Sequence, residues 1–243
     1  MPSFYTSHLQ INDKNLTIAG EEFHHISHVF RKRIGDEILL TSGNGLLAKA
    51  LIYEIDKKFV KVEILDIKKE KFTHPAIAVA FPLLKSKHDF LIVEKLTELG
   101  VKEFFPIVTN HSVRISSINT QDKFEKAAIA AIKQCDNAFL PKIHPTQRLQ
   151  DFLENLTDFQ PFAALETGKH KTLFNLVKEF NGQPICLIIG PEGGFDDEET
   201  ELFKMKNITT FTLGNHILRA ETAAIAAAAQ IMAILLENNE NYF

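Results

Sequence analysis

The sequence predicts an α/β protein in which a small β domain precedes a mostly parallel sheet covered by helices. From residue 76 onward, short apolar runs of strand length alternate with segments whose apolar residues have helical spacing. Residues 1–70 instead show several short strands, with a hairpin signal between two of them. The segment 66–75 between these patterns is charged and ends in Pro75. We therefore expect two domains, at residues 1–70 and 75–243.

The first domain is expected to be a small β-barrel with one helix. Phe23, Ile26 and Phe30 have the three-and-four spacing of one helical face, which predicts a helix over residues 21–30. Ser-Gly-Asn-Gly at residues 42–45 accepts positive φ and predicts a hairpin turn. The strands expected after the helix cover residues 37–41, 46–54 and 59–65.

The second domain is expected to hold a mostly parallel sheet. A helix over residues 87–99 carries apolar residues on one side and ends at Gly100. The four carboxylates of residues 196–199 are expected in the first turn of a helix, where they complement its dipole. The other expected helices cover residues 121–134 and 220–236, and the expected strands cover residues 76–81, 103–108, 162–165, 185–189 and 209–213.

Two of these strands end at glycines. Gly190 follows the strand at residues 185–189, and Gly214 follows the strand at residues 209–213. Parallel sheets bind ligands at the carboxyl ends of their strands, so two such loops predict a nucleotide-sized pocket, although plain turn chemistry is an alternative. Arg219 and Glu221 begin the helix after the second loop, and they could also be a surface ion pair.

The loops carry recognisable motifs. Residues 190–195 read G-P-E-G-G-F, and residues 213–223 read L-G-x-x-I-L-R-A-E-T-A. Both resemble the signature segments of the RsmE family, SPOUT-class methyltransferases that act on a uridine of 16S ribosomal RNA. The resemblance continues in T-E-L-G-V at residues 97–101 with Pro106 after it, in residues 134–141, and in H-H-I-x-x-V-x-R at residues 24–31. It therefore spans nearly the whole chain.

The resemblance implies a fold and partners that the residue pattern alone does not. It implies a PUA-like, RNA-binding first domain and a SPOUT second domain with a deep trefoil knot at about residues 185–225. Such threading breaks the usual rules of chain connection, so a pattern argument does not reach it. It also implies a homodimer in which one subunit holds the RNA of the small ribosomal subunit and the other methylates it.

The implied cofactor is S-adenosyl-L-methionine, bound by the two loops. The glycines are not followed by the Lys and Ser or Thr of a P-loop, so phosphate binding is less favoured. The residues expected to bind the cofactor are Leu165, Ile189, Gly190, Pro191, Glu192, Gly194, Leu213, Gly214, Ile217, Leu218, Arg219 and Thr222.

Methylation of uridine N3 requires loss of the N3 proton, which places negative charge on the uracil oxygens. Arg219 is the expected catalytic residue, because a guanidinium stabilises that charge in the transition state. Glu221 is expected either to orient Arg219 or to accept the proton. Of the ten histidines, only His216 stands near the pocket in the sequence. No metal is expected.

The net charge of −4 is unevenly distributed, with 0, +4 and −8 in residues 1–70, 71–150 and 151–243. RNA binding needs only a local basic patch. The candidates are Arg31, Lys32 and Arg33 in one cluster and Lys85 and Lys87 in another, and either could equally be a solvated surface. The family usually has an arginine where Ser3 and Phe4 stand and another where Asp136 and Asn137 stand; both are plausible phosphate contacts that this chain lacks, which leaves its RNA contacts open.

The chain is expected in the cytoplasm. The amino terminus lacks the basic and apolar regions of a signal peptide, and Cys135 and Cys186 match no metal or redox spacing. The apolar segment 220–236 is interrupted by Glu221 and Gln230, so no membrane span is expected. The alternatives to a uridine-N3 methyltransferase are a ribose 2′-O methyltransferase of the same class, a non-catalytic ribosome-assembly factor and, least favoured, a hydrolase.

Overall fold

The computed structural model describes residues 3–72, 76–114, 118–166, 171–177 and 182–237. The chain folds into two compact units. The first unit holds residues 1–72 and 128–140, and the second holds residues 73–127 and 141–243. We describe each unit by itself.

The first unit is built on a five-stranded sheet with the order β1-β3-β4-β5-β2. All pairs are antiparallel except β1 with β3. β1 and β2 are the edges of this open sheet, so the expected small barrel takes the form of a half-barrel. Shifts of register at Lys49/Ala50 and Ile52/Glu54 between β4 and β5 increase the local twist. The strands are β1 (Ser3–Tyr5), β2 (Asn15–Ala19), β3 (Glu37–Thr41), β4 (Leu46–Ile55) and β5 (Phe59–Lys69).

The helix expected over residues 21–30 is present as two short pieces. α1 (Gly20–His24) continues into a π-helical turn, η1 (His25–Val29). Phe23 and Ile26 are buried in the core of the sheet, as their spacing predicts, whereas Phe30 is 45% exposed. Arg31, with φ of 51°, then turns the chain away from the helix.

The division between the two units, at residues 72 and 73, falls inside the segment 66–75 that was expected to hold the domain boundary. Residues 66–69 continue β5 because they pair with residues 46–49 of β4, and residues 73–75 lie outside the described part of the chain. Residues 128–140 group with the first unit although they follow residues 76–127 in sequence. The backbone N–H groups of Leu140 and Gly45 explain this grouping, since they donate to the carbonyls of Gly43 and Ala138, each at 2.8 Å.

The second unit is built on an eight-stranded sheet with the order β11-β13-β10-β12-β6-β7-β8, in which β9 pairs with β7. Every pair among its described strands is parallel, as expected. The strands are β6 (Ile77–Pro82), β7 (Glu103–Val108), β8 (Lys142–Ile143), β9 (Gln147–Arg148), β10 (Gln160–Ala164), β11 (Lys171–Thr172), β12 (Ile185–Ile188) and β13 (Thr209–Thr212).

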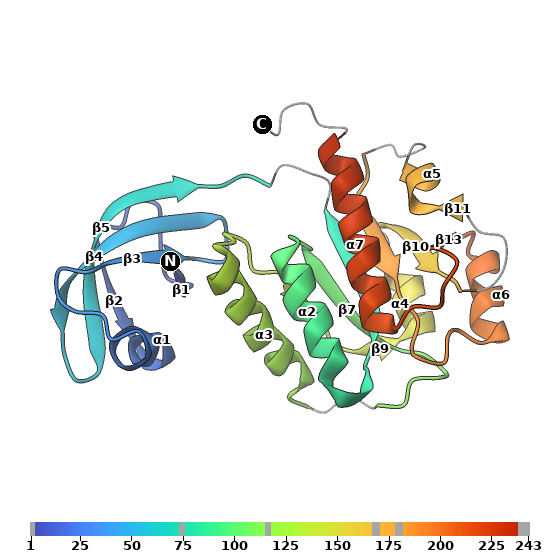
Figure 1. Cartoon of the computed structure of the whole chain (residues 1–243), viewed down its shortest axis with the longest axis horizontal. Coiled ribbons are helices and arrows are strands. Elements are labelled where there is room, and N and C mark those ends of the chain that lie inside the picture. Colours follow the sequence, from blue (N-terminus) through green and yellow to red (C-terminus); the bar gives the residue numbers. More distant parts are fainter. Residues whose placement is uncertain (1–2, 73–75, 115–117, 167–170, 178–181, 238–243) are drawn as a thin grey trace. The chain divides into compact units, whose positions relative to one another are not determined.

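Helices cover both faces of this sheet. Phe152 of α4 and Phe203 of α6 pack on one face with Ala78 and Ala80 of β6. α2 and α7 pack side by side on the other face (Figure 1). The helices and 3-10 turn of this part of the chain are η2 (Lys85–Lys87), α2 (His88–Glu98), α3 (Thr120–Cys135), α4 (Leu149–Asn155), α5 (Leu173–Val177), α6 (Asp197–Met205) and α7 (Ala220–Glu237).

The long helix α7 has the length and apolar composition of a membrane span, with a mean hydropathy of 1.5 over 18 residues. One face of the helix is nevertheless packed in the interior of the unit, whereas Ala229 and Ala233 on another face are exposed. Ala224, Ala227 and Ala228 are fully buried, and the helix packs against α2 and α5. Because small side chains allow close approach of the backbones, these buried alanines suit the packing of α7 against its neighbouring helices.

Candidate functional site

The order of the strands brings the two glycine loops to one edge of the sheet. β10 lies between β12 and β13 and pairs with both in parallel. The carboxyl ends of these three strands therefore open at the same edge. The backbone N–H of Leu165 donates to the carbonyl of Phe211 at 2.9 Å, which extends the contact of β10 with β13 into the loop region.

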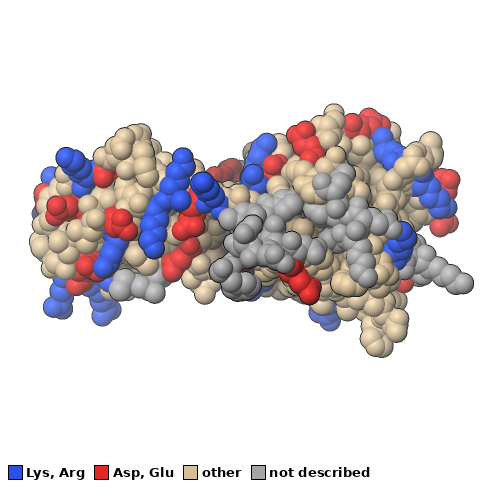
Figure 2. Space-filling model, turned by 90° about the horizontal axis from the view of Figure 1, so that it is seen from above, with Lys and Arg blue, Asp and Glu red and all other residues tan. Residues whose placement is uncertain are grey.

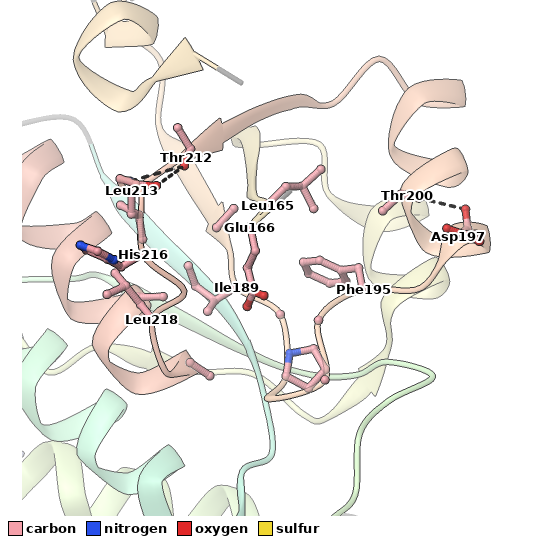
Figure 3. Close-up of a pocket in the computed structure, with 18 of the residues that line it drawn as sticks. Leu165, Glu166, Ile189, Phe195, Asp197, Thr200, Thr212, Leu213, His216 and Leu218 are labelled. Carbon is pink, nitrogen blue, oxygen red and sulfur yellow. Dashed lines mark hydrogen bonds between the residues drawn. The ribbon is translucent and has the colours of Figure 1, made fainter. Parts of the chain in front are cut away.

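A cavity of about 420 Å³ lies at this edge (Figure 3). In Figure 3, Leu213, His216 and Leu218 of the loop after β13 lie on one side of the cavity, and Phe195 of the loop after β12 lies on the other. The lining residues are Ala164, Leu165, Glu166, Ile189, Gly190, Pro191, Gly193, Gly194, Phe195, Asp197, Thr200, Lys204, Thr212, Leu213, Gly214, His216, Leu218, Ala220 and Ala223.

Two glycines in the first loop have a structural requirement. A Cβ on Gly190 would lie 3.1 Å from the ring of Phe195, so a side chain there would displace a wall of the cavity. Gly194 has φ of +70°, a left-handed conformation that other residues adopt only with strain. The loop therefore needs glycine for two reasons: the close approach of Gly190 to the Phe195 ring and the positive φ of Gly194.

The segment after β7 holds the first loop from outside the cavity. Nδ1 of His111 lies 3.1 Å from the carbonyl oxygens of both Gly193 and Gly194, so this nitrogen carries the donated proton. The backbone N–H of Asn110 donates to Oε1 of Glu199 at 2.9 Å, and its side-chain amide donates to Oδ2 of Asp196 at 2.7 Å. We call Asn110 and His111 the loop clamp.

The carboxylates expected in the first turn of a helix are confirmed there. Asp196 caps α6 and forms a capping box with Glu199, with bonds of 2.8 and 3.1 Å. The backbone N–H of Glu199 and the side chain of Asn110 lower the pKa of Asp196. Among the described residues, no group of three or more His, Cys, Asp or Glu side chains has a metal-binding arrangement.

Eight of the residues expected to bind a cofactor line the cavity, and four do not. Glu192, Ile217, Arg219 and Thr222 are exposed and do not line it. The Arg219 side chain forms no hydrogen bond or ion pair within the part of the chain that the structure describes. The eight lining residues are Leu165, Ile189, Gly190, Pro191, Gly194, Leu213, Gly214 and Leu218.

Glu221 lies elsewhere than expected. It is only 7% exposed and does not line the cavity. Its Oε1 lies 2.7 Å from Nδ1 of His88, the first residue of α2. Among the described residues it makes no hydrogen bond or ion pair with Arg219, which it was expected either to orient or to assist as proton acceptor.

Several lining residues were not predicted from the sequence. Gly193, Phe195, Ala220 and Ala223 stand inside the two motifs, so their neighbours could have indicated them. Asp197, Thr200 and Lys204 have the three-and-four spacing of one face of α6. The spacing in the sequence shows that these three residues share a helix face. Only the packing of α6 beside the glycine loop shows that this face lines the cavity.

The candidate RNA contacts lie on the surface. Arg31 and Arg33 are exposed, and Nζ of Lys32 donates to the carbonyl of Glu37 at 3.2 Å. Lys85 and Lys87 are exposed on η2 in the second unit. Figure 2 shows basic and acidic side chains interspersed on the visible face of the first unit, so no single-sign patch covers that face.

Family models match both parts of the chain. An RNA methyltransferase domain matches residues 72–232, and an RNA methyltransferase PUA domain matches residues 18–65. The chain is 28% identical over 229 residues to the ribosomal RNA small subunit methyltransferase E of Rickettsia conorii, covering 94% of this chain and 93% of that protein. It is 31% identical over 169 residues to the protein of the same name from Mesomycoplasma hyopneumoniae, covering 68% of this chain and 73% of that one.

Solved structures resemble the whole chain. A putative methyltransferase from Legionella pneumophila, in complex with S-adenosylmethionine, superposes with a TM-score of 0.86 at 26% identity and covers 96% of this chain and 97% of that one. The ribosomal RNA small subunit methyltransferase E of Neisseria gonorrhoeae, bound to S-adenosylmethionine, superposes with a TM-score of 0.88 at 22% identity, covering 96% and 98%. At that identity the second likeness shows the fold alone.

Proposed function

Because this chain belongs to the ribosomal RNA small subunit methyltransferase E family, we propose that it transfers the methyl group of S-adenosylmethionine to N3 of a uridine in 16S ribosomal RNA. It is a soluble RNA methyltransferase with a PUA-like half-barrel and a SPOUT-like parallel-sheet domain. Three features are proposed beyond family membership: N3 as the methylated atom, uracil as the methylated nucleobase, and the cytoplasm as the place of action.

The observation that carries the proposal is the cavity at the ends of β10, β12 and β13. Its volume of about 420 Å³ is within the range of small-molecule sites. It combines the apolar side chains of Leu165, Ile189 and Leu218 with polar groups on α6. This lining suits a cofactor that has an apolar adenine ring and a charged amino-acid end. When bound, S-adenosylmethionine supplies an activated methyl group.

The chemistry at uridine N3 requires stabilisation of negative charge. In this proposal Arg219 points its guanidinium at the uracil oxygens while the N3 proton passes to solvent water at the mouth of the cavity. The Arg219 side chain is exposed and the residue directly follows Leu218 of the cavity wall, which leaves the guanidinium available to a substrate at the mouth of the cavity. Its charge is then worth more in the transition state than in the ground state.

RNA binding is assigned in this proposal to both basic clusters. Arg31, Lys32 and Arg33 would contact phosphates from the PUA-like domain, and Lys85 and Lys87 from the methyltransferase domain. The knot at about residues 185–225 and the homodimer, in which one subunit holds the RNA that the other methylates, are also part of the proposal. The resemblance to the family supports the knot and the homodimer, and the local concentration of basic residues supports the two RNA contacts.

The test is methyl incorporation from labelled S-adenosylmethionine into small ribosomal subunits that lack the modification, followed by nucleoside analysis. N3-methyluridine is the expected product. A 2′-O-methylated nucleoside would instead identify a ribose methyltransferase. Binding of donor and RNA without incorporation would identify an assembly factor, and either result contradicts the proposal.

A further inference from the structure

Glu221 stands in a signature motif, yet its carboxylate faces a histidine from a distant part of the chain. Oε1 of Glu221 lies 2.7 Å from Nδ1 of His88, across 133 residues of sequence. The side chain of Glu221 is 10% exposed and that of His88 is 39% exposed. A buried carboxylate is costly unless it is hydrogen-bonded, and His88 provides that bond.

The position of Glu221 on α7 links this pair to the cavity. Ala220 and Ala223 line the cavity, whereas Glu221, between them in sequence, does not. Residues on a helix that are one position apart point about 100° away from each other. Glu221 therefore holds the first turn of α7 from behind, and the loop that ends at this turn forms the wall with Leu213 and Leu218.

The turn that carries His88 also touches the first loop. The backbone N–H of Lys85 donates to Oε1 of Glu192, next to Gly193, at 3.4 Å. Ser86 and Lys87 have φ values of 53° and 63°, so two successive non-glycine residues are left-handed. Such a strained conformation persists only where surrounding contacts hold the backbone in place. The segment 85–88 is thus bonded to the glycine loop through Glu192 and to the first turn of α7 through Glu221.

We propose that His88 and Glu221 form a positioning pair, which fixes the loop at residues 213–220 relative to the glycine loop at residues 190–195. The inference rests on the proposed donor site in the cavity. Its consequence is that Glu221 acts on the donor through the shape of the cavity and not as the base that removes the uridine proton. The other charged groups near His88 are Lys85 and Lys87 on its own turn and Asp89, which is paired with Arg114.

The test is a double-mutant cycle with donor affinity as the readout. His88→Ala and Glu221→Ala are each expected to raise the Kd for S-adenosylmethionine about 10- to 100-fold, the effect of losing a hydrogen bond to a charged group. The double variant is expected to be no weaker than the weaker single variant, because both substitutions remove one interaction. His88→Lys, which places an ammonium hydrogen-bond donor opposite Glu221, is expected to bind the donor within about threefold of the wild type and to keep its kcat.

A second His–Glu pair provides a matched control. Nε2 of His144 lies 2.6 Å from Oε2 of Glu103, and neither residue lines the cavity. His144→Ala is expected to lower the melting temperature without changing donor affinity. Calorimetric titration of the donor and thermal unfolding of every variant separate a change in the cavity from a loss of folding.

Two results would overturn the inference. One is unchanged donor affinity in His88→Ala and Glu221→Ala. The other is loss of turnover in His88→Lys at normal donor affinity, which would identify His88 as a proton acceptor.

Ala223→Leu, which fills the cavity, separates the proposed donor site from the positioning pair. Its control is Ala130→Leu on the exposed face of α3. If Ala223→Leu leaves donor binding intact, the donor site itself is wrong, and the positioning pair is wrong with it.

Discussion

Arg219 shows how a single side chain can be available for chemistry without lining the cavity. It follows the cavity residue Leu218, its side chain is exposed, and it forms no ion pair with the described residues. A guanidinium that is exposed and has no ion pair among the described residues can meet charge that develops on a substrate. A buried or paired arginine would first have to be released.

We expect Arg219→Ala to lower kcat/KM by about 10²- to 10³-fold, roughly 3–4 kcal/mol of transition-state stabilisation, because one charge-stabilising donor is lost. Donor affinity should stay near that of the wild type. Single-turnover methylation and calorimetric titration measure the two effects. Arg148→Ala, at another exposed arginine, is the control, and an equal loss in both variants would contradict the role of Arg219.

Asp89 is a second residue with a measurable property. It is fully buried beside Arg114, and burial raises the pKa of its carboxyl above the ordinary value of 3.8, although the Arg114 guanidinium lowers it in part. A carboxyl whose pKa is higher in the folded state favours folding most below its unfolded pKa. That contribution is lost as the pH rises through the folded pKa.

We therefore expect the stability of the wild type, relative to Asp89→Asn, to fall as the pH rises from below 3.8 through the raised pKa. Denaturant unfolding of both proteins across this pH range measures the difference. A difference that is constant with pH, or that grows as the pH rises, would contradict the stated direction of the pKa shift.

At the scale of elements, the glycine loop depends on a neighbouring segment for its conformation. The loop clamp of Asn110 and His111 bonds to the carbonyls of Gly193 and Gly194 and to the acidic cap of α6. These bonds come from the end of β7, two strands away from β12 in the sheet. A loop that must expose its backbone to a ligand is thereby ordered from its opposite side.

His111→Ala removes two of these bonds, and we expect it to raise the donor Kd by about tenfold. The melting temperature should change little, because the loop is at the surface. Calorimetric titration measures the affinity, with the exposed His8→Ala as the control. An unchanged Kd would mean that the loop keeps its conformation without the clamp.

For the whole molecule, the proposed division of work between two subunits can be tested by mixing variants. Arg219→Ala disables the proposed chemistry, and the double substitution of Arg31 and Arg33 by Glu disables the proposed RNA contact. If one subunit holds the RNA that the other methylates, a mixed dimer has one complete site. We expect an equal mixture to regain about a quarter of wild-type activity, since half of the dimers are mixed and each has one working site.

The control for this mixture is each variant alone, and both should be nearly inactive. Methyl incorporation after joint refolding measures the recovery. No recovery, with dimers present by light scattering, would show that each subunit binds and methylates its own RNA. Light scattering that finds only monomers in the active wild type would contradict the homodimer.

The sequence by itself determined the family, the class of both domains and most of the regular elements. Local signals carry this information: strand-length apolar runs, the helical spacing that ends at Gly100, the acidic start of α6, and the motifs around Gly190 and Arg219. Each acts over a few residues, and the structure confirms the elements that they predict. The short strands β1, β8, β9 and β11 escaped prediction because two or three residues show no period.

The tertiary structure decided which of these residues meet. It placed β10 between β12 and β13, brought α6 to the cavity wall, and grouped residues 128–140 with the first unit. It also paired Glu221 with His88 across 133 residues, where the sequence suggested Arg219 or the substrate. These outcomes depend on contacts between segments far apart in the chain. The buried carboxylate of Glu221 bonds to the polar group that packing places beside it, and a local sequence pattern does not contain that information.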